Sequence, residues 1–236
     1  MTRIATWSGP RNLSTAMMYA FGAREDCDVV DEPFYAAYLA ETGLDHPMRD
    51  AVLASQPHDP AQVVANLSVP RENHLYIKLM TQHMTGSVPL GWLADVAHVF
   101  LIRHPARVVA SYGAKRDGVT AADLGFHRQR ELLDHVRAAG LRVTITDSAD
   151  IRRDPETELR RICAEIDVPW RPEMLCWPTG GHRSDGVWAP HWYGAVHRST
   201  GFAGAEGPLP SLDEGGRTLV DEIMPDYEAM VAAREA

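Results

Sequence analysis

The sequence has few cysteines, no long uncharged hydrophobic run and no excess of basic residues. Its three cysteines, Cys27, Cys163 and Cys176, are scattered and form no CxxC pair. This pattern indicates neither a disulfide framework nor a zinc site, and it favours a reducing, cytoplasmic compartment. No stretch approaches the ~18 apolar residues of a membrane span. We therefore expect no membrane association, and no signal or transit peptide because the first predicted strand begins at once.

The shortage of positive charge bears on the class of partner. The formal net charge is -9 at pH 7. A nucleic-acid backbone is not expected as the partner, because binding it requires a basic face. A basic pocket for one small anion is compatible with an acidic surface. The 236 residues, 45% hydrophobic and 23% charged, are typical of one globular domain over residues 1–236.

Short apolar runs alternate with segments of helical periodicity. This order predicts an α/β fold with a central, mostly parallel sheet of five strands flanked by helices. The predicted strands are residues 4–6, 27–31, 75–79, 99–102 and 142–146. The predicted helices are residues 16–21, 34–41, 61–67, 106–115, 120–139, 155–166 and 212–232, with a break near Pro225 in the last. Residues 44–60 and 177–210 are expected to be irregular, the second as a ligand-facing loop.

Residues 8–15, Ser-Gly-Pro-Arg-Asn-Leu-Ser-Thr, connect the first predicted strand to the first predicted helix. Gly9 and Pro10 favour a sharp turn, Arg11 supplies a fixed positive charge, and Ser14 and Thr15 supply hydroxyl groups. A loop at a helix N-terminus with these groups favours an oxyanion ligand. The loop lacks the Gly-Lys-[Ser/Thr] ending of nucleoside-triphosphate loops. An ordinary strand-to-helix turn with a Ser or Thr cap is the alternative.

Polar residues also follow the other predicted strands. Glu32 follows the second strand, Lys78 lies in the third with His83 shortly after it, and Arg103 ends the fourth, with Ser111 on the next helix. The carboxyl ends of parallel strands meet at one edge of a sheet, where ligands bind. We therefore expect these cations, hydroxyls and one carboxylate to converge.

With these residues in place, the chain resembles the sulfotransferases that use 3′-phosphoadenosine 5′-phosphosulfate. Residues 8–15 resemble that family's 5′-phosphosulfate loop, with Arg11 where many members have Lys. Arg103 with Ser111 eight residues later resembles its 3′-phosphate motif. Residues 187–202 resemble a group of bacterial and plant sulfotransferase-like proteins, some of which carry an aminotransferase-like label.

This resemblance implies a P-loop-like three-layer fold and transfer of a sulfuryl group to a hydroxyl or amine of a small, soluble acceptor. The nucleotide is a co-substrate, and no metal is expected. The resemblance implies that the donor is bound by the loop and by three residues further along the chain: Gly9, Pro10, Arg11, Asn12, Leu13, Ser14, Thr15, Arg103, Ser111 and Arg198.

Four residues are candidates for the chemistry. Arg11 would stabilise charge on the transferred group. Glu32 is the first candidate for the base that accepts the acceptor's proton, and His83 is the second. Lys78 either assists the leaving group or merely ends an edge strand. The ordinary alternatives are a helix-capping role for Glu32 and a surface or core position for His83.

Two other functions remain open from the sequence. One is an ATP-dependent kinase on the same fold, which the missing Gly-Lys-[Ser/Thr] sequence disfavours. The other is a module that binds the nucleotide without turnover. Among the aromatic residues, Trp7 either stacks on adenine or fills the core, and core is the safer expectation. Trp188, His191, Trp192 and His197 are candidates for the wall of an acceptor pocket.

Overall fold

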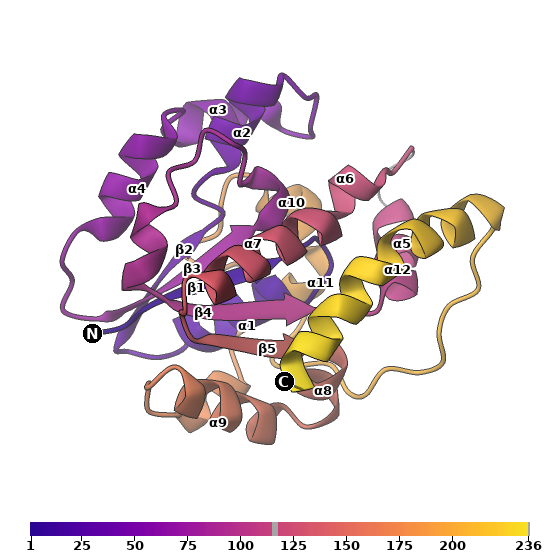
Figure 1. Ribbon diagram of the computed structural model, residues 1–236. Coiled ribbons are helices and arrows are strands. Elements are labelled where there is room, and N and C mark those ends of the chain that lie inside the picture. Colours follow the sequence, from indigo (N-terminus) through magenta and orange to yellow (C-terminus); the bar gives the residue numbers. More distant parts are fainter. Residues whose placement is uncertain (115–117, 236) are drawn as a thin grey trace.

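The computed structural model describes residues 1–114 and 118–235. Five parallel strands form one sheet in the order β2-β3-β1-β4-β5 (Figure 1). The strands are β1 (Arg3–Ser8), β2 (Cys27–Asp31), β3 (His74–Met80), β4 (Ala97–Ile102) and β5 (Val143–Asp147). The expected α/β fold is confirmed, and all five predicted strands are present within one or two residues of their predicted bounds.

Helices connect and cover the strands. Before β4 they are α1 (Ser14–Gly22), α2 (Tyr35–Thr42), α3 (Arg49–Ser55) and α4 (Pro60–Ser68). After β4 they are α5 (Pro105–Gly113), α6 (Ala121–Leu124), α7 (Phe126–Ala138), α8 (Ser148–Arg153), α9 (Pro155–Glu165), α10 (Ala189–Trp192), α11 (Gly194–His197) and α12 (Glu214–Glu235). Short 3₁₀ helices cover Thr81–His83, Gly91–Asp95 and Pro172–Leu175.

The sheet is buried on both faces, because successive residues of each strand enter different hydrophobic cores. In β4, Val99 and Leu101 pack in one core and Phe100 and Ile102 in the other. The first core is covered chiefly by α1, α2 and α9, and the second by α4, α5, α7 and α12. Figure 1 shows α12 alongside α5 and α7, which it contacts. The result is the expected three-layer arrangement.

The strand order positions the functional loops. β1 lies between β3 and β4, with Ser8 at its end paired with Met80 on one side and Leu101 on the other. The helix after β1 covers one face, whereas the helix after β4 covers the opposite face. Loops that leave neighbouring strands toward opposite faces open a crevice at the carboxyl edge. The loop at residues 8–15 and the Arg103 turn border this crevice.

Several segments differ from the sequence-based prediction. α8 lies where no helix is predicted, and α10 and α11 lie within residues 177–210, which are expected to be irregular. Residues 44–60 are not irregular throughout, because they contain α3, which buries Val52 alone among its seven residues. One buried position gives no detectable helical periodicity. The predicted helix at 120–139 is two helices, because Gly125 between α6 and α7 has φ 69°. The predicted helix at 106–115 is α5, and its final residue, Lys115, lies outside the described residues.

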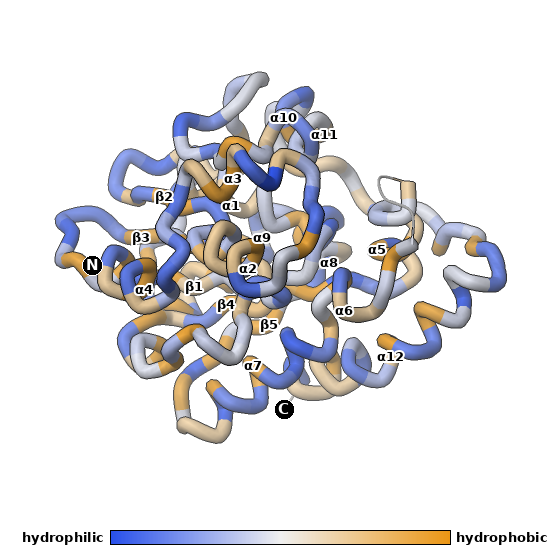
Figure 2. The backbone as a smooth tube through the Cα atoms, turned by 90° about the horizontal axis from the view of Figure 1, so that it is seen from above, coloured by the Kyte–Doolittle hydropathy of each residue, from blue (hydrophilic) through white to orange (hydrophobic). Residues whose placement is uncertain are grey.

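The C-terminal helix also differs from expectation. α12 continues through Pro225, where a break was predicted. Pro225 is exposed, while Val220 and Ile223 before it and Met230 after it are buried. Packing on both sides of the proline therefore maintains one helix. Hydrophilic and hydrophobic residues alternate along α12 (Figure 2), and among the described residues no helix combines the length and hydrophobicity needed to cross a membrane.

Candidate functional site

The loop after β1 presents an uncapped helix end. The residue that precedes α1 is Leu13, whose φ is 70° and whose side chain makes no capping hydrogen bond. The prediction that a Ser or Thr caps this helix is therefore wrong. Ser14 and Thr15 instead begin the helix and line a cavity. Because the first N–H groups of a helix lack partners within it, this end favours an anion.

Two residues of this loop hold it in position. A Cβ atom on Gly9 would lie 2.3 Å from the carbonyl oxygen of Leu124, so only glycine permits this approach of the loop to α6. Asn12 is fully buried, and its Nδ2 donates a hydrogen bond of 3.1 Å to the carbonyl oxygen of Leu101 in β4. Gly9 and Asn12 therefore support the loop, whereas Pro10, Arg11 and Leu13 line the cavity.

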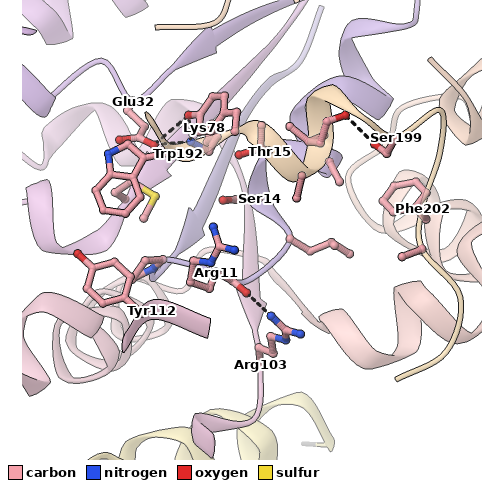
Figure 3. A pocket seen from close by; sticks show the side chains of 18 of the residues that line it. Arg11, Ser14, Thr15, Glu32, Lys78, Arg103, Tyr112, Trp192, Ser199 and Phe202 are labelled. Carbon is pink, nitrogen blue, oxygen red and sulfur yellow. Dashed lines mark hydrogen bonds and ion pairs between the residues drawn. The ribbon is translucent and has the colours of Figure 1, made fainter. Parts of the chain in front are cut away.

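Arg11 and Arg103 lie close together at the crevice. Arg11 has φ 63°, and its Nε donates a hydrogen bond of 2.8 Å to Ser111 Oγ on α5. One Nη of Arg103 donates a hydrogen bond of 2.7 Å to the carbonyl oxygen of Arg11 (Figure 3). Burial and the nearby charge of Arg103 lower the pKa of Arg11. Anionic groups bound at these two arginines would offset the repulsion between their charges.

A second polar group is built from Glu32, Lys78, Asp31 and Tyr193. Lys78, in β3 between β2 and β1, is 1% exposed. Its Nζ donates to Glu32 Oε1, to Asp31 Oδ1 at 2.9 Å and to the Tyr193 hydroxyl at 2.6 Å. The Tyr193 hydroxyl also lies 3.1 Å from Glu32 Oε1. Lys78 is therefore not an edge-strand terminator but the centre of a buried network.

The network sets the protonation of its members. Burial raises the pKa of Glu32 above its ordinary value, although the charge of Lys78 opposes this shift. Burial alone would lower the pKa of Lys78, but Asp31 and Glu32 together raise it. Glu32 also has an unusual backbone φ of 41°, and such strain is concentrated at functional sites. A carboxylate with a raised pKa beside a cavity is suited to accept a proton.

His83 is buried close to this network. Its ring stacks between Tyr35 and Tyr38, with centroid distances of 4.4 and 4.8 Å. Its Nδ1 lies 3.9 Å from Glu32 Oε2 and has no hydrogen-bond partner among the residues that the structure describes. Burial, with the charges of His46 and Lys78, lowers the pKa of His83 well below its ordinary value. The ring is therefore neutral, as a base requires, but a base with so low a pKa is weak.

One cavity connects these groups. Its volume is about 280 Å³. Its lining includes Arg11, Ser14, Thr15, Glu32, Lys78, His83, Arg103, Arg152, Trp192 and Phe202. In Figure 3, Ser14 and Thr15 lie between the Glu32–Lys78 pair and Arg103. The cavity therefore has cationic groups on one side of the loop and a buried acid–amine pair on the other.

Some predicted residues do not line this cavity. Ser111 is outside the lining, but it accepts a hydrogen bond from Arg11, which is part of the lining. Arg198 follows α11 and is not part of the lining, and His191 is also outside it. His197 is paired with Asp185 at 3.0 Å. Of the four candidates for an acceptor wall, Trp192 is the one that lines the cavity.

Sequence reasoning missed several residues of the site. Tyr193 and Asp31 were not identified as partners of Lys78, and Arg152 was not placed at the cavity. Glu206 was also missed, although its Oε1 lies 3.0 Å from Arg103 Nε. A glutamate in an irregular segment gives no sequence signal. Asp31 ends β2 at the edge of the sheet where the other candidates lie, but the sequence does not show that it pairs with Lys78. Trp7 is fully buried and donates to His98 Nδ1, which confirms its core position.

Comparison with known proteins agrees with this geometry. A family model described as a sulfotransferase domain matches residues 2–234. The Arabidopsis thaliana branched-chain-amino-acid aminotransferase-like protein 1 is 36% identical over 229 residues, and protein 2 is 31% identical over 232 residues. The alignments cover 96% and 98% of this chain but 41% of each relative. The chain thus spans about two fifths of the length of these curated relatives.

Among solved structures, the sulfotransferase domain of the olefin synthase from Synechococcus PCC 7002 has a similar fold. The TM-score is 0.55 at 18% identity, covering 95% of this chain and 94% of that one. The five-stranded parallel sheet and its covering helices are therefore shared with a solved sulfotransferase domain. Since the family model covers nearly all of the sequence, the chain belongs to the sulfotransferase family.

Proposed function

We propose that the chain transfers a sulfuryl group from 3′-phosphoadenosine 5′-phosphosulfate to a hydroxyl or amine of a small acceptor. The cavity is the observation that carries this proposal, because it has arginines on one side and the Glu32–Lys78 pair on the other. A nucleotide with an anionic group at each end of its ribose would satisfy Arg11 and Arg103. Its sulfuryl group would then face the acid–amine pair.

The loop after β1 would bind the 5′-phosphosulfate. Arg11 and the uncapped start of α1 at Ser14 and Thr15 supply positive charge and N–H donors. In the transfer, the acceptor atom bonds to sulfur while the bond between sulfur and the bridging oxygen breaks. That oxygen leaves on adenosine 3′,5′-bisphosphate. Charge on the transferring group is stabilised by Arg11, as in phosphoryl transfer.

The Arg103 turn would bind the 3′-phosphate. Arg103 lines the cavity, and Ser111 is hydrogen-bonded to Arg11 beside it. A guanidinium group binds phosphate through charge-assisted hydrogen bonds. Ser111 would orient Arg11 and would donate a hydrogen bond from its hydroxyl to the 3′-phosphate.

Glu32 is the proposed base. Its carboxylate is buried at the cavity, and its raised pKa makes it a better proton acceptor than an exposed glutamate. Lys78 holds Glu32 Oε1 and leaves Oε2 for the acceptor. His83 is the second candidate, since its Nδ1 lies near Glu32 Oε2.

The curated relatives have aminotransferase-like names, but the environment of Lys78 does not favour aminotransferase chemistry at this site. A lysine that forms a Schiff base must react as the neutral amine. The two carboxylates beside Lys78 raise its pKa and hold it protonated. The other lysine of the sequence, Lys115, lies outside the described residues.

Nucleotide titration with a transfer assay tests the proposal. We expect calorimetry to show binding of adenosine 3′,5′-bisphosphate without magnesium, and weaker binding of ATP. Incubation with the sulfuryl donor and a panel of alcohols, phenols and amines should yield a sulfated product. Tight ATP binding that requires magnesium would indicate a kinase instead. Bisphosphate binding without any transfer would indicate a binding module.

A further inference from the structure

Three arginines converge on the carboxylate of Glu206. Arg103 donates to Glu206 Oε1 through Nε at 3.0 Å and also through an Nη. Arg107 Nε lies 2.7 Å from Oε2, and an Nη of Arg152 lies 3.0 Å from Oε1. The Glu206 side chain is only 4% exposed. These arginines come from the turn after β4, from α5 and from α8, so the cluster joins three separate elements.

Glu206 is carried by a segment that is otherwise at the surface. Residues 203–205 and 207–209 on either side of it are exposed. The same arginines hold the segment's backbone: Arg152 Nε donates to the carbonyl oxygen of Gly204 at 2.9 Å, and Arg107 donates to the carbonyl oxygens of Gly207 and Pro208. In Figure 1 the segment is part of an extended connection that leads to the start of α12. Its attachment therefore depends on polar contacts to these arginines.

The cluster has more positive than negative charge. Three guanidinium groups face one carboxylate, and Arg11 lies next to Arg103. Two nitrogens of Arg103 donate hydrogen bonds to Glu206, and the third donates to the Arg11 carbonyl oxygen. A phosphate dianion would balance this charge better than a carboxylate, with three acceptor oxygens in place of two.

We infer that Glu206 is a displaceable internal ligand of the 3′-phosphate subsite. In the free chain its carboxylate pairs with Arg103, Arg107 and Arg152. A nucleotide with a 3′-phosphate binds by taking these arginines from Glu206 and releasing residues 203–209 from them. Glu206 thereby sets the affinity for nucleotides that have a 3′-phosphate and leaves the affinity for those that lack one unchanged. This inference rests on the proposed function.

A permanent structural tie would behave differently. If Glu206 stayed on the arginines when nucleotide bound, its removal would loosen the segment and either weaken binding or leave it unchanged. If Glu206 is displaced, its removal means that the 3′-phosphate no longer competes with a carboxylate for the arginines, so binding becomes tighter. Only displacement therefore predicts tighter binding when Glu206 is removed.

The substitution Glu206→Gln tests the inference, with calorimetry of adenosine 3′,5′-bisphosphate and of AMP, which has no 3′-phosphate. We expect E206Q to bind the bisphosphate about tenfold or more tightly than wild type, with AMP binding unchanged. The matched control is Glu156→Gln, which removes the exposed Glu156–Arg160 pair on α9 and should change neither affinity. Unchanged or weaker bisphosphate binding, or an equal gain for AMP, would overturn the inference.

A measurement on the unmodified chain covers the case in which E206Q does not fold. Hydrogen–deuterium exchange of residues 203–209 should become faster when the bisphosphate binds and stay the same with AMP. Slower exchange with the bisphosphate would contradict displacement. If wild type binds the bisphosphate but E206Q gains nothing, this inference fails and the proposed function stands. If neither chain binds the bisphosphate, the proposed function fails first and the inference falls with it.

Discussion

Under the proposed function, Arg103 is the side chain on which donor binding depends most. It lines the cavity, and it also donates to the Arg11 carbonyl oxygen, so it supports the neighbouring loop. We predict that Arg103→Ala weakens binding of adenosine 3′,5′-bisphosphate by at least about 30-fold, because a buried anion loses its charged partner. Calorimetry would measure this loss. Arg198→Ala is the matched control and should change affinity by less than about threefold, since Arg198 lies outside the cavity lining. Equal losses in the two variants would remove Arg103 from this role.

Glu32 and His83 can be separated by paired substitutions. If Glu32 is the base, Glu32→Gln should retain nucleotide binding and slow transfer by about 100-fold or more. His83→Asn should slow it far less, because the depressed pKa of His83 makes it a poor proton acceptor. Single-turnover kinetics with saturating donor would measure both rates. A normal rate in E32Q together with a large loss in H83N would assign the base to His83.

The pH profile gives an independent test of the same residue. A base acts when it is deprotonated, so kcat/KM should fall as pH decreases through the pKa of Glu32. Burial raises that pKa, so the midpoint should lie above the ordinary value of 4.5. We expect this acid limb in wild type and in H83N, and we expect it to disappear from the residual activity of E32Q. An acid limb that persists in E32Q would assign the titration to another group.

Glycine turns determine where several elements begin and end. Gly125 has φ 69°, and a Cβ atom there would lie 2.8 Å from Thr81 Oγ1. Gly140 after α7 has φ 71°, but a Cβ atom would meet nothing within 4 Å. We predict that Gly140→Ala costs about 1 kcal/mol of stability from backbone strain alone. Gly125→Ala should cost about 1–3 kcal/mol more, because the site is also overpacked. Urea unfolding of both variants would measure this difference, and equal costs would contradict the close approach to Thr81.

The proline inside α12 gives a second test on a single element. Pro225 is exposed and removes a hydrogen bond from the helix interior, whereas Pro155 begins α9, where its missing N–H costs nothing. We therefore predict that Pro225→Ala stabilises the chain by about 1–3 kcal/mol. Pro155→Ala should be neutral or slightly destabilising. Thermal and urea unfolding would compare the two, and destabilisation by P225A would mean that the proline ring itself packs favourably.

The strands could be predicted because each is a short apolar run bounded by polar or turn residues, as in Val99–Phe100–Leu101–Ile102 before Arg103. The helices α3 and α8 were missed because each is short and buries only one or two of its residues. The division between α6 and α7 depends on a close contact between Gly125 and Thr81, and residues this far apart in sequence cannot be paired from a single chain. The continuity of α12 depends on tertiary packing that outweighs a local proline signal.

For the molecule as a whole, parallel-sheet topology accounts for most of what could be predicted about the site. The carboxyl ends of β1, β2, β3 and β4 meet at one edge, so the residues that follow them converge whatever their separation in sequence. The segment at residues 177–210 could not be positioned in this way. Tyr193 and Glu206 come from irregular chain, and their contacts with Lys78 and Arg103 follow from packing rather than from any periodic pattern.

The distribution of charge in the fold is as important as its topology. The chain has a formal charge of -9, yet Arg11, Arg103 and Arg152 line one cavity. Such a cavity in an acidic protein would favour a small anion over a polyanion, because the surrounding surface would repel a polyanion. The same cavity contains the Glu32–Lys78 pair, so the proposed transfer would take place between this pair and the loop after β1.

A crystal structure of the chain with adenosine 3′,5′-bisphosphate would test most directly whether Arg11 and Arg103 bind opposite ends of one nucleotide. We expect the 5′-phosphate at Arg11 and the start of α1, the 3′-phosphate at Arg103, and Glu206 displaced from the arginines. A nucleotide bound outside this cavity, or one whose two phosphates both avoid these arginines, would contradict the proposed function.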